Sequence, residues 1–283
     1  MSNYRFNDLK DKVCVITGGA GVLGKAMCEA LAVNGVKLAI LDINLESATA
    51  VANEISSQYN TVAVGIEANV LEKVSLEAAA AQIKAELGAI DILINGAGGN
   101  SPAATSKLEM LDENNLDQLE DSFYGLSMDG FDKVFALNFK GTLLPSMVFT
   151  KDMLDKKDGV VINISSMNAY RPLTKIPAYS AAKASINNFT EWLSVHLART
   201  GIRVNAIAPG FFLTNQNRFL LTDEKTGELT DRGHKIIANT PMGKFGKPED
   251  LQGTLLFLLS EASAFITGIT IPVDGGFNAY SGV

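Results

Sequence analysis

The sequence of 283 residues is poor in the side chains that cross-link chains or bind metals, with two cysteines and two histidines. Cys14 and Cys28 fall in an expected strand and an expected helix, where a lone cysteine usually behaves as a small buried apolar side chain. We therefore expect two free thiols. His196 and His234 are far apart, and neither is spaced from a cysteine as zinc ligands are. We expect no metal site, which argues against a zinc-dependent alcohol dehydrogenase.

Long hydrophobic runs and basic clusters are also missing. No apolar run approaches the roughly 18 residues of a membrane span, and the first residues, MSNYRFNDLKDK, are polar. The chain has 24 Lys and Arg against 31 Asp and Glu, a formal charge of -7. Nucleic-acid binding needs clustered cations that neutralise phosphates. We therefore expect a cytoplasmic protein with neither a membrane nor a nucleic-acid partner, in which an acidic substrate would need a local basic pocket.

Short apolar runs alternate with longer helical patterns along the whole chain. The runs predict strands at residues 12–16, 36–41, 61–66, 89–95, 159–165, 202–208 and 269–273. Helices are predicted near residues 22–34, 45–58, 72–87, 129–155, 177–200 and 248–260. Strands that are apolar throughout are typical of a parallel sheet covered on both faces. We predict an α/β fold with a Rossmann-type doubly wound parallel sheet of about seven strands, in three α/β/α layers and a single domain over residues 1–283.

Two segments exceed normal connection lengths. Residues 99–128 follow the fourth predicted strand, and residues 209–247 follow the sixth. Open α/β sheets bind ligands at the carboxyl ends of their strands, where both segments emerge. We expect a substrate-side insertion at 99–128 and a lid or substrate loop at 209–247, with plain surface elaboration as the alternative.

The segment TGGAGVLGKA, directly after the first predicted strand, holds overlapping phosphate-binding patterns. Gly19, Gly21 and Gly24 spell the GxGxxG of dinucleotide-binding loops, whereas Gly19, Gly24 and Lys25 spell most of a nucleotide triphosphatase loop. The triphosphatase loop needs a Ser or Thr after the lysine to hold magnesium, and Ala26 stands there. This excludes the triphosphatase and leaves a dinucleotide loop, in which glycines allow the backbone to approach a pyrophosphate at a helix N-terminus.

Asp42 ends the second predicted strand, 18 residues after Gly24. A carboxylate there can accept hydrogen bonds from the adenosine ribose hydroxyls and would repel a 2′-phosphate. The next residues, Ile43 and Asn44, offer no cation to bind such a phosphate. We therefore predict NAD rather than NADP as the cofactor. The alternative is that Asp42 only caps the following helix.

Tyr179 and Lys183 are four residues apart at the start of a predicted helix, so their side chains share a face. A lysine ammonium beside the phenol favours the phenolate and should lower the tyrosine pKa from its usual value of about 10. The tyrosine could then exchange a proton with a substrate oxygen while hydride moves at the neighbouring carbon. A serine from the preceding strand end, Ser165 or Ser166, would stabilise the charge that develops.

These motifs together resemble the short-chain dehydrogenase/reductase family over nearly the whole chain. The family's serine, tyrosine and lysine match Ser166, Tyr179 and Lys183, and its catalytic asparagine matches Asn138 in the segment NFKG. The resemblance implies that these four residues are catalytic, with Asn138 holding a water between the lysine and solvent. It also implies a homotetramer, since family members usually are tetramers.

The resemblance further implies a set of cofactor-binding residues. The family's NNAG turn appears as residues 95–98, and its Pro-Gly motif after the sixth strand is followed by Thr214, implied to contact the nicotinamide carboxamide. Besides Tyr179 and Lys183, the implied cofactor-binding residues are Gly18, Gly21, Val22, Leu23, Gly24, Asp42, Asn69, Val70, Asn95, Ala97, Pro209 and Thr214.

Three positions depart from the family pattern. Val22 stands where the middle glycine of the loop is expected, and we expect Gly21 to provide the close backbone approach instead. Asn69 replaces an aspartate that contacts adenine, and its amide can still bond the adenine amine. Gly96 replaces the second asparagine of NNAG, which should loosen that turn.

Within the family, the sequence is similar to bacterial D-mannonate oxidoreductases of the short-chain type in the motifs INGAGGN, APGFFLTNQNR and TPMGKFGKPEDL. These enzymes interconvert D-fructuronate and D-mannonate with NAD(H). A hexuronate needs at least one cation for its carboxylate and neutral groups for its hydroxyls. The predicted substrate residues are Asn100, Asn168, Lys175 and Arg218, with Lys175 first, and with Arg171, Lys107 and Gln216 as further candidates.

Two other functions stay open at this point. One keeps the fold and changes the substrate, as in a gluconate- or polyol-type dehydrogenase or a 3-oxoacyl reductase. The other is a catalytically silent NAD-binding sensor, although such a protein would be free to lose the four catalytic residues.

Overall fold

The structure, a computed structural model, describes residues 6–213, 221–223 and 226–282. These residues form a seven-stranded parallel sheet in the order β3-β2-β1-β4-β5-β6-β7. The strands are β1 (Val13–Thr17), β2 (Lys37–Asp42), β3 (Ala63–Glu67), β4 (Ile92–Asn95), β5 (Gly159–Ile164), β6 (Ile202–Pro209) and β7 (Thr270–Val273). The strand order reverses between β1 and β4, which creates the crevice where open α/β sheets bind ligands. The predicted doubly wound sheet is confirmed.

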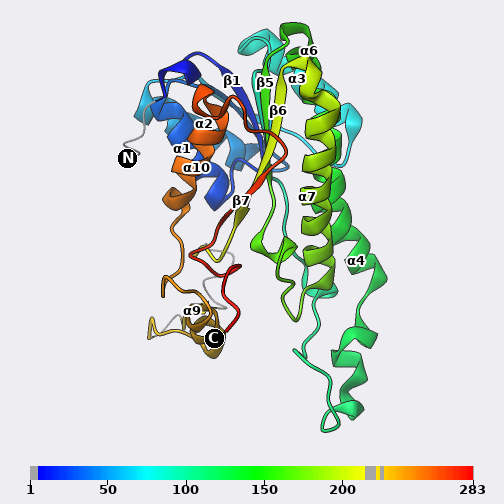
Figure 1. The fold of residues 1–283 in the computed structure, drawn as a ribbon. Helices are drawn as coiled ribbons and strands as arrows, with labels where there is room; N and C mark the ends of the chain where they lie inside the picture. The colour runs from blue at the N-terminus through cyan, green and yellow to red at the C-terminus, as the bar shows by residue number, and fades with distance from the viewer. Residues whose placement is uncertain (1–5, 214–220, 224–225, 283) are drawn as a thin grey trace.

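Helices cover both faces of this sheet. On one face lie α1 (Val22–Val33), α2 (Leu45–Tyr59) and α10 (Gln252–Leu259), and on the other lie α3 (Lys73–Glu86), α4 (Met128–Phe135), α5 (Gly141–Phe149) and α7 (Pro177–Leu197), as Figure 1 shows. Alternate residues of β1 serve the two layers, because Cys14 and Ile16 belong to one core cluster while Val13 and Val15 belong to the other. The three-layer arrangement therefore follows from strands that carry apolar residues on both faces.

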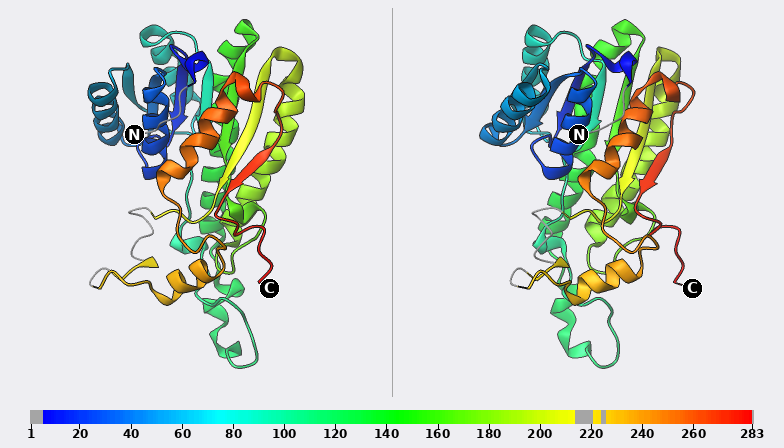
Figure 2. Two further views of the ribbon diagram at one scale, coloured as in Figure 1. Left: turned by 60° about the vertical axis from the view of Figure 1, so that its left-hand side comes forward. Right: turned by 90° about the vertical axis from the view of Figure 1, so that its left-hand side faces the viewer.

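Both predicted insertions lie beyond the carboxyl ends of the strands. Residues 99–128 contain only short 3₁₀ helices before α4, and this segment reaches furthest from the sheet (Figure 2). Helix α9 (Asp231–Ala238) lies at the same end of the molecule, on the other side of the crevice (Figures 1 and 2). The amide of Ser106 donates to the carbonyl of Lys175 at 3.0 Å, which ties the insertion to the loop that precedes α7.

The single helix predicted near residues 129–155 is divided in the structure. A π-helical turn, Ala136–Lys140, separates α4 from α5, and α6 (Lys151–Lys156) follows. The cause lies in Asn138, whose side-chain amide donates to the Val134 carbonyl at 2.8 Å. That carbonyl would accept the backbone N–H of residue 138 in a regular α-helix, so the side-chain amide displaces the backbone register.

Two further predictions concern groups outside the crevice. Cys14 and Cys28 are both free thiols with no exposed surface, as expected for small apolar side chains. Within the part of the protein that the structure describes, no helix is long and apolar enough to cross a membrane.

Candidate active site

The glycine loop passes very close to the turn that follows β4. Gly18 has a φ of +64°, and a Cβ there would lie 2.9 Å from the Cα of Ala97. A Cβ on Gly24, in the first turn of α1, would lie 2.5 Å from the Gly18 carbonyl oxygen. Both positions therefore require glycine for reasons internal to the loop. At Gly21 a Cβ would meet only the Gly18 oxygen, at 3.3 Å, so the protein itself leaves more space at this residue.

The start of α1 suits an anion. Gly21 is the N-cap residue, and among the described residues no side chain caps the first turn. Backbone N–H groups at such a helix start bind phosphates, so the loop fits a pyrophosphate. The side chain of Lys25 instead forms an ion pair with Glu54 at 2.6 Å, on α2. This lysine is thus directed away from the role that it would have in a triphosphatase.

Asp42 lies half-buried at the carboxyl end of β2, beside this loop. The amide of Gly19 donates to the Leu41 carbonyl at 3.2 Å, which holds the loop against the end of β2. The N-cap of α2 is Asn44, whose side chain accepts from the Ser47 amide at 2.9 Å. The alternative that Asp42 only caps α2 is therefore wrong, although its carboxylate does accept from the Asn44 amide at 3.2 Å.

Asn69 and Val70 follow β3, next to the end of β2. The side-chain oxygen of Asn69 accepts from the Leu71 amide at 3.0 Å, and its nitrogen donates to Glu72 at 2.8 Å. One hydrogen of the side-chain amide remains beyond the donation to Glu72. Val70 is buried against Gly141, where a Cβ would lie 3.0 Å from a Val70 methyl group.

The turn after β4 is held tightly to β1. The hydroxyl of Thr17 accepts from the amides of Gly96 and Ala97, at 3.1 and 3.2 Å. A Cβ on Gly96 would lie 2.7 Å from the Thr17 carbonyl oxygen. The expectation that Gly96 loosens this turn is therefore wrong, because the glycine permits a close approach that two hydrogen bonds then fix.

Asn95, a predicted cofactor residue, points into the core. Its side-chain nitrogen donates to Ser146 at 2.9 Å and to Asn163 at 2.8 Å, and 1% of its surface is exposed. Its side-chain oxygen has no hydrogen-bond partner among the described residues. Only the backbone of Asn95 is thus placed to line the crevice, while its side chain joins β4, β5 and α5.

The four residues predicted to be catalytic come together at this edge of the sheet. Ser166, two residues after β5, lies close enough to Tyr179, in the first turn of α7, to lower the pKa of the tyrosine. The amino nitrogen of Lys183 lies 5.5 Å from the centre of the Tyr179 ring and donates to the Ile164 carbonyl at 2.7 Å. Asn138 lies on the same side of Gly98 as Lys183, because a Cβ on Gly98 would be 2.6 Å from the Asn138 oxygen and 3.4 Å from the Lys183 nitrogen.

Asn138 pairs with the loop through both atoms of its amide. Its oxygen accepts from the Gly99 amide at 3.2 Å, and its nitrogen donates to the Gly99 carbonyl at 2.7 Å. The side chain is fully buried. The π-helical turn described above is what places this amide over the backbone of residues 98 and 99.

Burial changes the proton affinities of both ionisable residues of the group. Desolvation raises the pKa of Tyr179, and the hydrogen bond from Ser166 offsets part of this increase. Desolvation lowers the pKa of Lys183 to about 7. The expected lowering of the Tyr179 pKa by Lys183 is therefore not produced by the protein groups alone, because burial disfavours the charged form of both side chains.

The structure places the predicted substrate residues in different surroundings. Asn168 is buried beside Ser166, with its backbone amide donating to the Ser166 hydroxyl at 3.2 Å. Lys175 is half-buried and lines a cavity of about 230 Å³. Asn100 is exposed and donates to Thr105 at 2.9 Å.

The remaining candidates do not share one site. Arg171 is exposed and donates weakly to the Tyr170 carbonyl at 3.5 Å, and Lys107 is paired with Asp121 in the insertion. The predicted residues Thr214, Gln216 and Arg218 lie outside the described residues.

Two basic residues at this site were missed in the sequence. Arg232 and Lys235 of α9 line the same cavity as Lys175. Their signal was present, since they stand three residues apart in the amphipathic segment DRGHKIIA, within the predicted lid. The segment alone, however, does not tell which of its cations faces a pocket.

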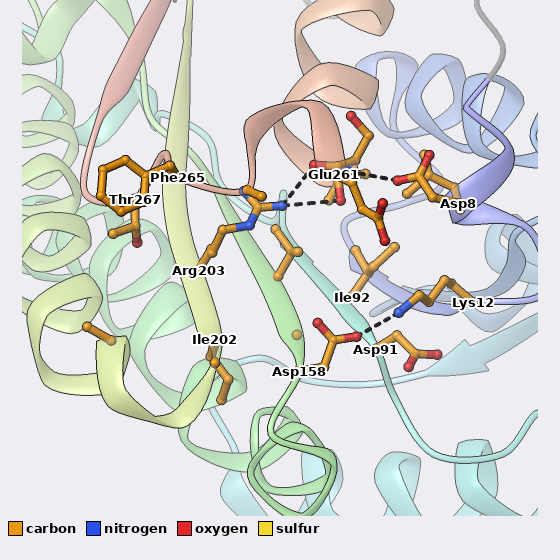
Figure 3. Close-up of a pocket in the computed structure, with 18 residues that line it drawn as sticks. Asp8, Lys12, Asp91, Ile92, Asp158, Ile202, Arg203, Glu261, Phe265 and Thr267 are labelled. Atoms are coloured by element: carbon orange, nitrogen blue, oxygen red, sulfur yellow. Dashed lines mark hydrogen bonds and ion pairs between the residues drawn. The ribbon is translucent and has the colours of Figure 1, made fainter.

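A larger cavity lies elsewhere in the described part of the protein. It has a volume of about 520 Å³ and is found at the amino ends of β4, β5 and β6, opposite the crevice (Figure 3). Its charged groups serve the fold: Lys12 pairs with Asp158 at 2.7 Å, and Arg203 donates to carbonyls at the end of α10. None of the four predicted catalytic residues lines this cavity.

Comparison with known proteins defines the class. The model of the short chain dehydrogenase family matches residues 12–225, and the chain belongs to this family of oxidoreductases. It is 55% identical to an uncharacterized oxidoreductase of Bacillus subtilis, over 98% of both chains.

Two further relatives are informative. A crystal structure of a candidate D-mannonate oxidoreductase from Haemophilus influenzae, with bound NAD, matches with a TM-score of 0.92 and 51% identity over 98% of both chains. A 3-oxoacyl-[acyl-carrier-protein] reductase of Aquifex aeolicus is 32% identical, over 95% of this chain and 98% of its own.

Proposed function

We propose that this protein is an NAD-dependent oxidoreductase that interconverts D-fructuronate and D-mannonate. The observation that carries the proposal is that Ser166 and Tyr179 lie together next to buried Lys183, at the end of the crevice that the glycine loop enters. The choice of substrate is supported by the motifs shared with D-mannonate oxidoreductases of the short-chain type and by the relative from Haemophilus influenzae.

The chain offers candidate residues for each part of NAD. The backbone of Gly18, Gly21, Val22, Leu23 and Gly24 would hold the pyrophosphate at the uncapped start of α1. The remaining assignments are Asp42 to the adenosine ribose, Asn69 and Val70 to the adenine, the backbone of Asn95 and Ala97 to the inner ribose, and Pro209 and Thr214 to the nicotinamide. Bound NAD would supply the hydride acceptor, and NADH the donor.

Tyr179 would move the proton. In the reducing direction its hydroxyl gives a proton to the carbonyl oxygen of the substrate, and in the oxidising direction it takes one from the alcohol. The Ser166 hydroxyl donates a hydrogen bond to the same oxygen and stabilises the charge that develops there. Because burial raises the pKa of Tyr179, the protein groups alone favour the protonated phenol, which is the form that a ketone reduction needs.

Lys183 and Asn138 would act behind the tyrosine. With a pKa lowered to about 7, Lys183 can gain or lose a proton near neutral pH and so replenish the proton that Tyr179 exchanges. Asn138 holds the backbone of Gly99 beside this lysine and would position a water on its solvent side. Asn100, Asn168, Lys175 and Arg218 are proposed to bind the sugar acid.

The test is an NADH oxidation assay with the purified protein and a panel of ketones. The panel contains D-fructuronate, other keto-sugar acids, a neutral ketose and a 3-oxoacyl thioester. We expect the largest kcat/KM for D-fructuronate. A preference for the thioester would instead favour the function of the Aquifex aeolicus relative, and NADH binding without turnover of any ketone would favour a silent sensor.

We also propose a homotetramer. Helix α7 carries Trp192 and Val195 on its outer face, with 58% and 79% of their surfaces exposed. Trp192 stacks between Phe189 and His196, with ring centres 6.3 and 4.9 Å away. An apolar stripe of this kind is typical of a helix that packs against a second subunit.

A further inference from the structure

A small basic cavity is lined in part by the loop that leads into α7, the helix of Tyr179 and Lys183. It has a volume of about 230 Å³ and is bounded by the loop before α7, by α9 and by the insertion. Three cations line it, namely Lys175, Arg232 and Lys235, against one carboxylate, Glu109. In a protein with a formal charge of -7, this is a local reversal of sign.

Glu109 comes from the insertion and enters this group of cations. Its carboxylate lies 2.8 Å from the amino nitrogen of Lys235. The hydrogen bond from Lys235 is the main cause that lowers the pKa of Glu109, and the charges of Lys175 and Arg232 act in the same direction. The place that Glu109 occupies is therefore one where a carboxylate is favoured by all three cations.

The cations are fixed by the packing of α9. Arg232 and Lys235 stand three residues apart and so share a face of the helix. Gly233 packs closely against the Leu221 carbonyl, and Ile236, which also lines the cavity, is buried, so both residues hold this helix in place. The Thr230 hydroxyl accepts from the Gly233 amide at 3.1 Å and caps the helix.

Two features link the cavity to the reacting groups. One is the chain that leads into α7, and the other is a pair of aromatic rings that line the cavity. Lys175 precedes Tyr179 by four residues, at the entry to α7. Phe211, which follows Pro209 and the end of β6, meets Phe277 at a centre-to-centre distance of 5.2 Å, and both rings line the cavity. A sugar acid held here by its carboxylate would therefore have its carbon skeleton beside the segments that carry the proposed catalytic and nicotinamide-binding residues.

We propose that this cavity is the carboxylate subsite of the substrate, and that Glu109 is an internal counter-ion which the substrate carboxylate displaces. The proposal rests on the proposed sugar-acid activity and adds to it Arg232, Lys235 and Glu109 as specificity-determining residues. It also gives the insertion a role in substrate binding, because the substrate would break the contact between Glu109 and Lys235 of α9.

The first test compares saturation kinetics for D-fructuronate. Replacing Arg232 with glutamine removes one charge-assisted bond, so KM should rise about tenfold while kcat changes little. Arg199→Gln, an exposed cation outside this cavity, removes the same charge and should leave KM unchanged. A KM for Arg232→Gln within twofold of the Arg199→Gln value would overturn the proposal.

Glu109→Gln provides a test of opposite sign. Removing the internal competitor should lower KM for D-fructuronate, by about threefold for an exposed ion pair. In the double variant Glu109→Gln/Arg232→Gln this gain should shrink, because the two residues act on the same carboxylate. If Glu109 only braced the insertion, its replacement would raise KM or leave it unchanged, and that result would overturn the counter-ion assignment.

A binding experiment separates this proposal from the proposed function. Thermal unfolding is followed with D-gluconate, which has a carboxylate, and with uncharged D-sorbitol. D-gluconate should stabilise the wild type and Glu109→Gln but not Arg232→Gln, and D-sorbitol should stabilise none of them. If this pattern appears without turnover of D-fructuronate, the proposed function fails and the subsite stands. Equal stabilisation of wild type and Arg232→Gln by D-gluconate, or stabilisation of neither, overturns the subsite.

Discussion

The amino nitrogen of Lys183 donates a 2.7 Å hydrogen bond to the carbonyl of Ile164 in β5. This bond fixes the lysine between the end of the sheet and the Tyr179 ring, one helical turn away on α7. The carbonyl is an uncharged partner, so no opposite charge compensates for the loss of water around an ammonium. Burial therefore lowers the pKa of Lys183 to about 7.

The first prediction concerns stability against pH. The pKa of Lys183 is lower in the folded protein than its usual value of 10.5, so between these values the unfolded state holds more protons. The free energy of unfolding should then rise with pH above about 7, by about 2 kcal/mol up to pH 9. Lys183→Met lacks this titration. Urea unfolding of the wild type and of Lys183→Met at pH 7 and 9 checks the prediction. If the free energies of unfolding of the two proteins change equally with pH, the lowered pKa of Lys183 is contradicted.

The second prediction concerns proton transfer. Tyr179→Phe should keep NADH binding and lose turnover by about 10² to 10⁴, which is what a positioned acid or base contributes. The control is Tyr170→Phe, since the Tyr170 hydroxyl only donates to the Thr270 carbonyl at 3.3 Å. Turnover numbers and NADH dissociation constants of both variants are compared. Near-normal turnover of Tyr179→Phe would falsify the assignment of proton transfer to Tyr179.

The third prediction concerns cofactor choice. Asp42→Ala should raise the kcat/KM for NADPH relative to NADH, because the carboxylate that repels a 2′-phosphate is gone. Asn44→Ala is the control: it removes the N-cap of α2 and should cost about 1 kcal/mol of stability while leaving the cofactor ratio unchanged. If the two variants have the same cofactor ratio, Asp42 takes no part in discrimination.

The fourth prediction uses two neighbouring glycines. A Cβ on Gly98 would collide with the Asn138 amide, whereas a Cβ on Gly99 meets no atom within 4 Å among the described residues. Gly98→Ala should therefore displace Asn138 and lower turnover, by up to about 100-fold for a misplacement near 1 Å. Gly99→Ala should remain close to wild type. Equal turnover of the two variants would show that the position of Asn138 does not matter.

The fold could be predicted because its information is local. Most residues of β1 and β5 are apolar, and the burial of both strands on both faces follows from that pattern. Motif spacing predicted the four candidate catalytic residues that the structure brings together, yet the sequence predicted one long helix where Asn138 creates a π-helical turn. That turn depends on a side-chain amide competing for a backbone carbonyl, which periodicity does not reveal.

The basic cavity could not be predicted, because its charges come from three distant segments. Glu109, Lys175 and Lys235 meet only when the insertion, the loop before α7 and α9 are brought together at one edge of the sheet. In the sequence Glu109 and Lys235 are ordinary surface charges, and only Lys175 is predicted to bind substrate. Lys107 is a further candidate in the sequence, and the structure shows that it is paired within the insertion.

The last prediction concerns assembly. Val195 on α7 and Val74 on α3 are equally exposed, at 79% each, so a glutamate at neither position is buried in an isolated subunit. If the α7 face is an interface, Val195→Glu buries a charge without a partner and should split the tetramer, while Val74→Glu should not. Light scattering gives the masses, to be compared with 30.2 kDa for one subunit. A wild type with the mass of one subunit, or a Val195→Glu variant with the mass of the wild type, would exclude α7 as the contact.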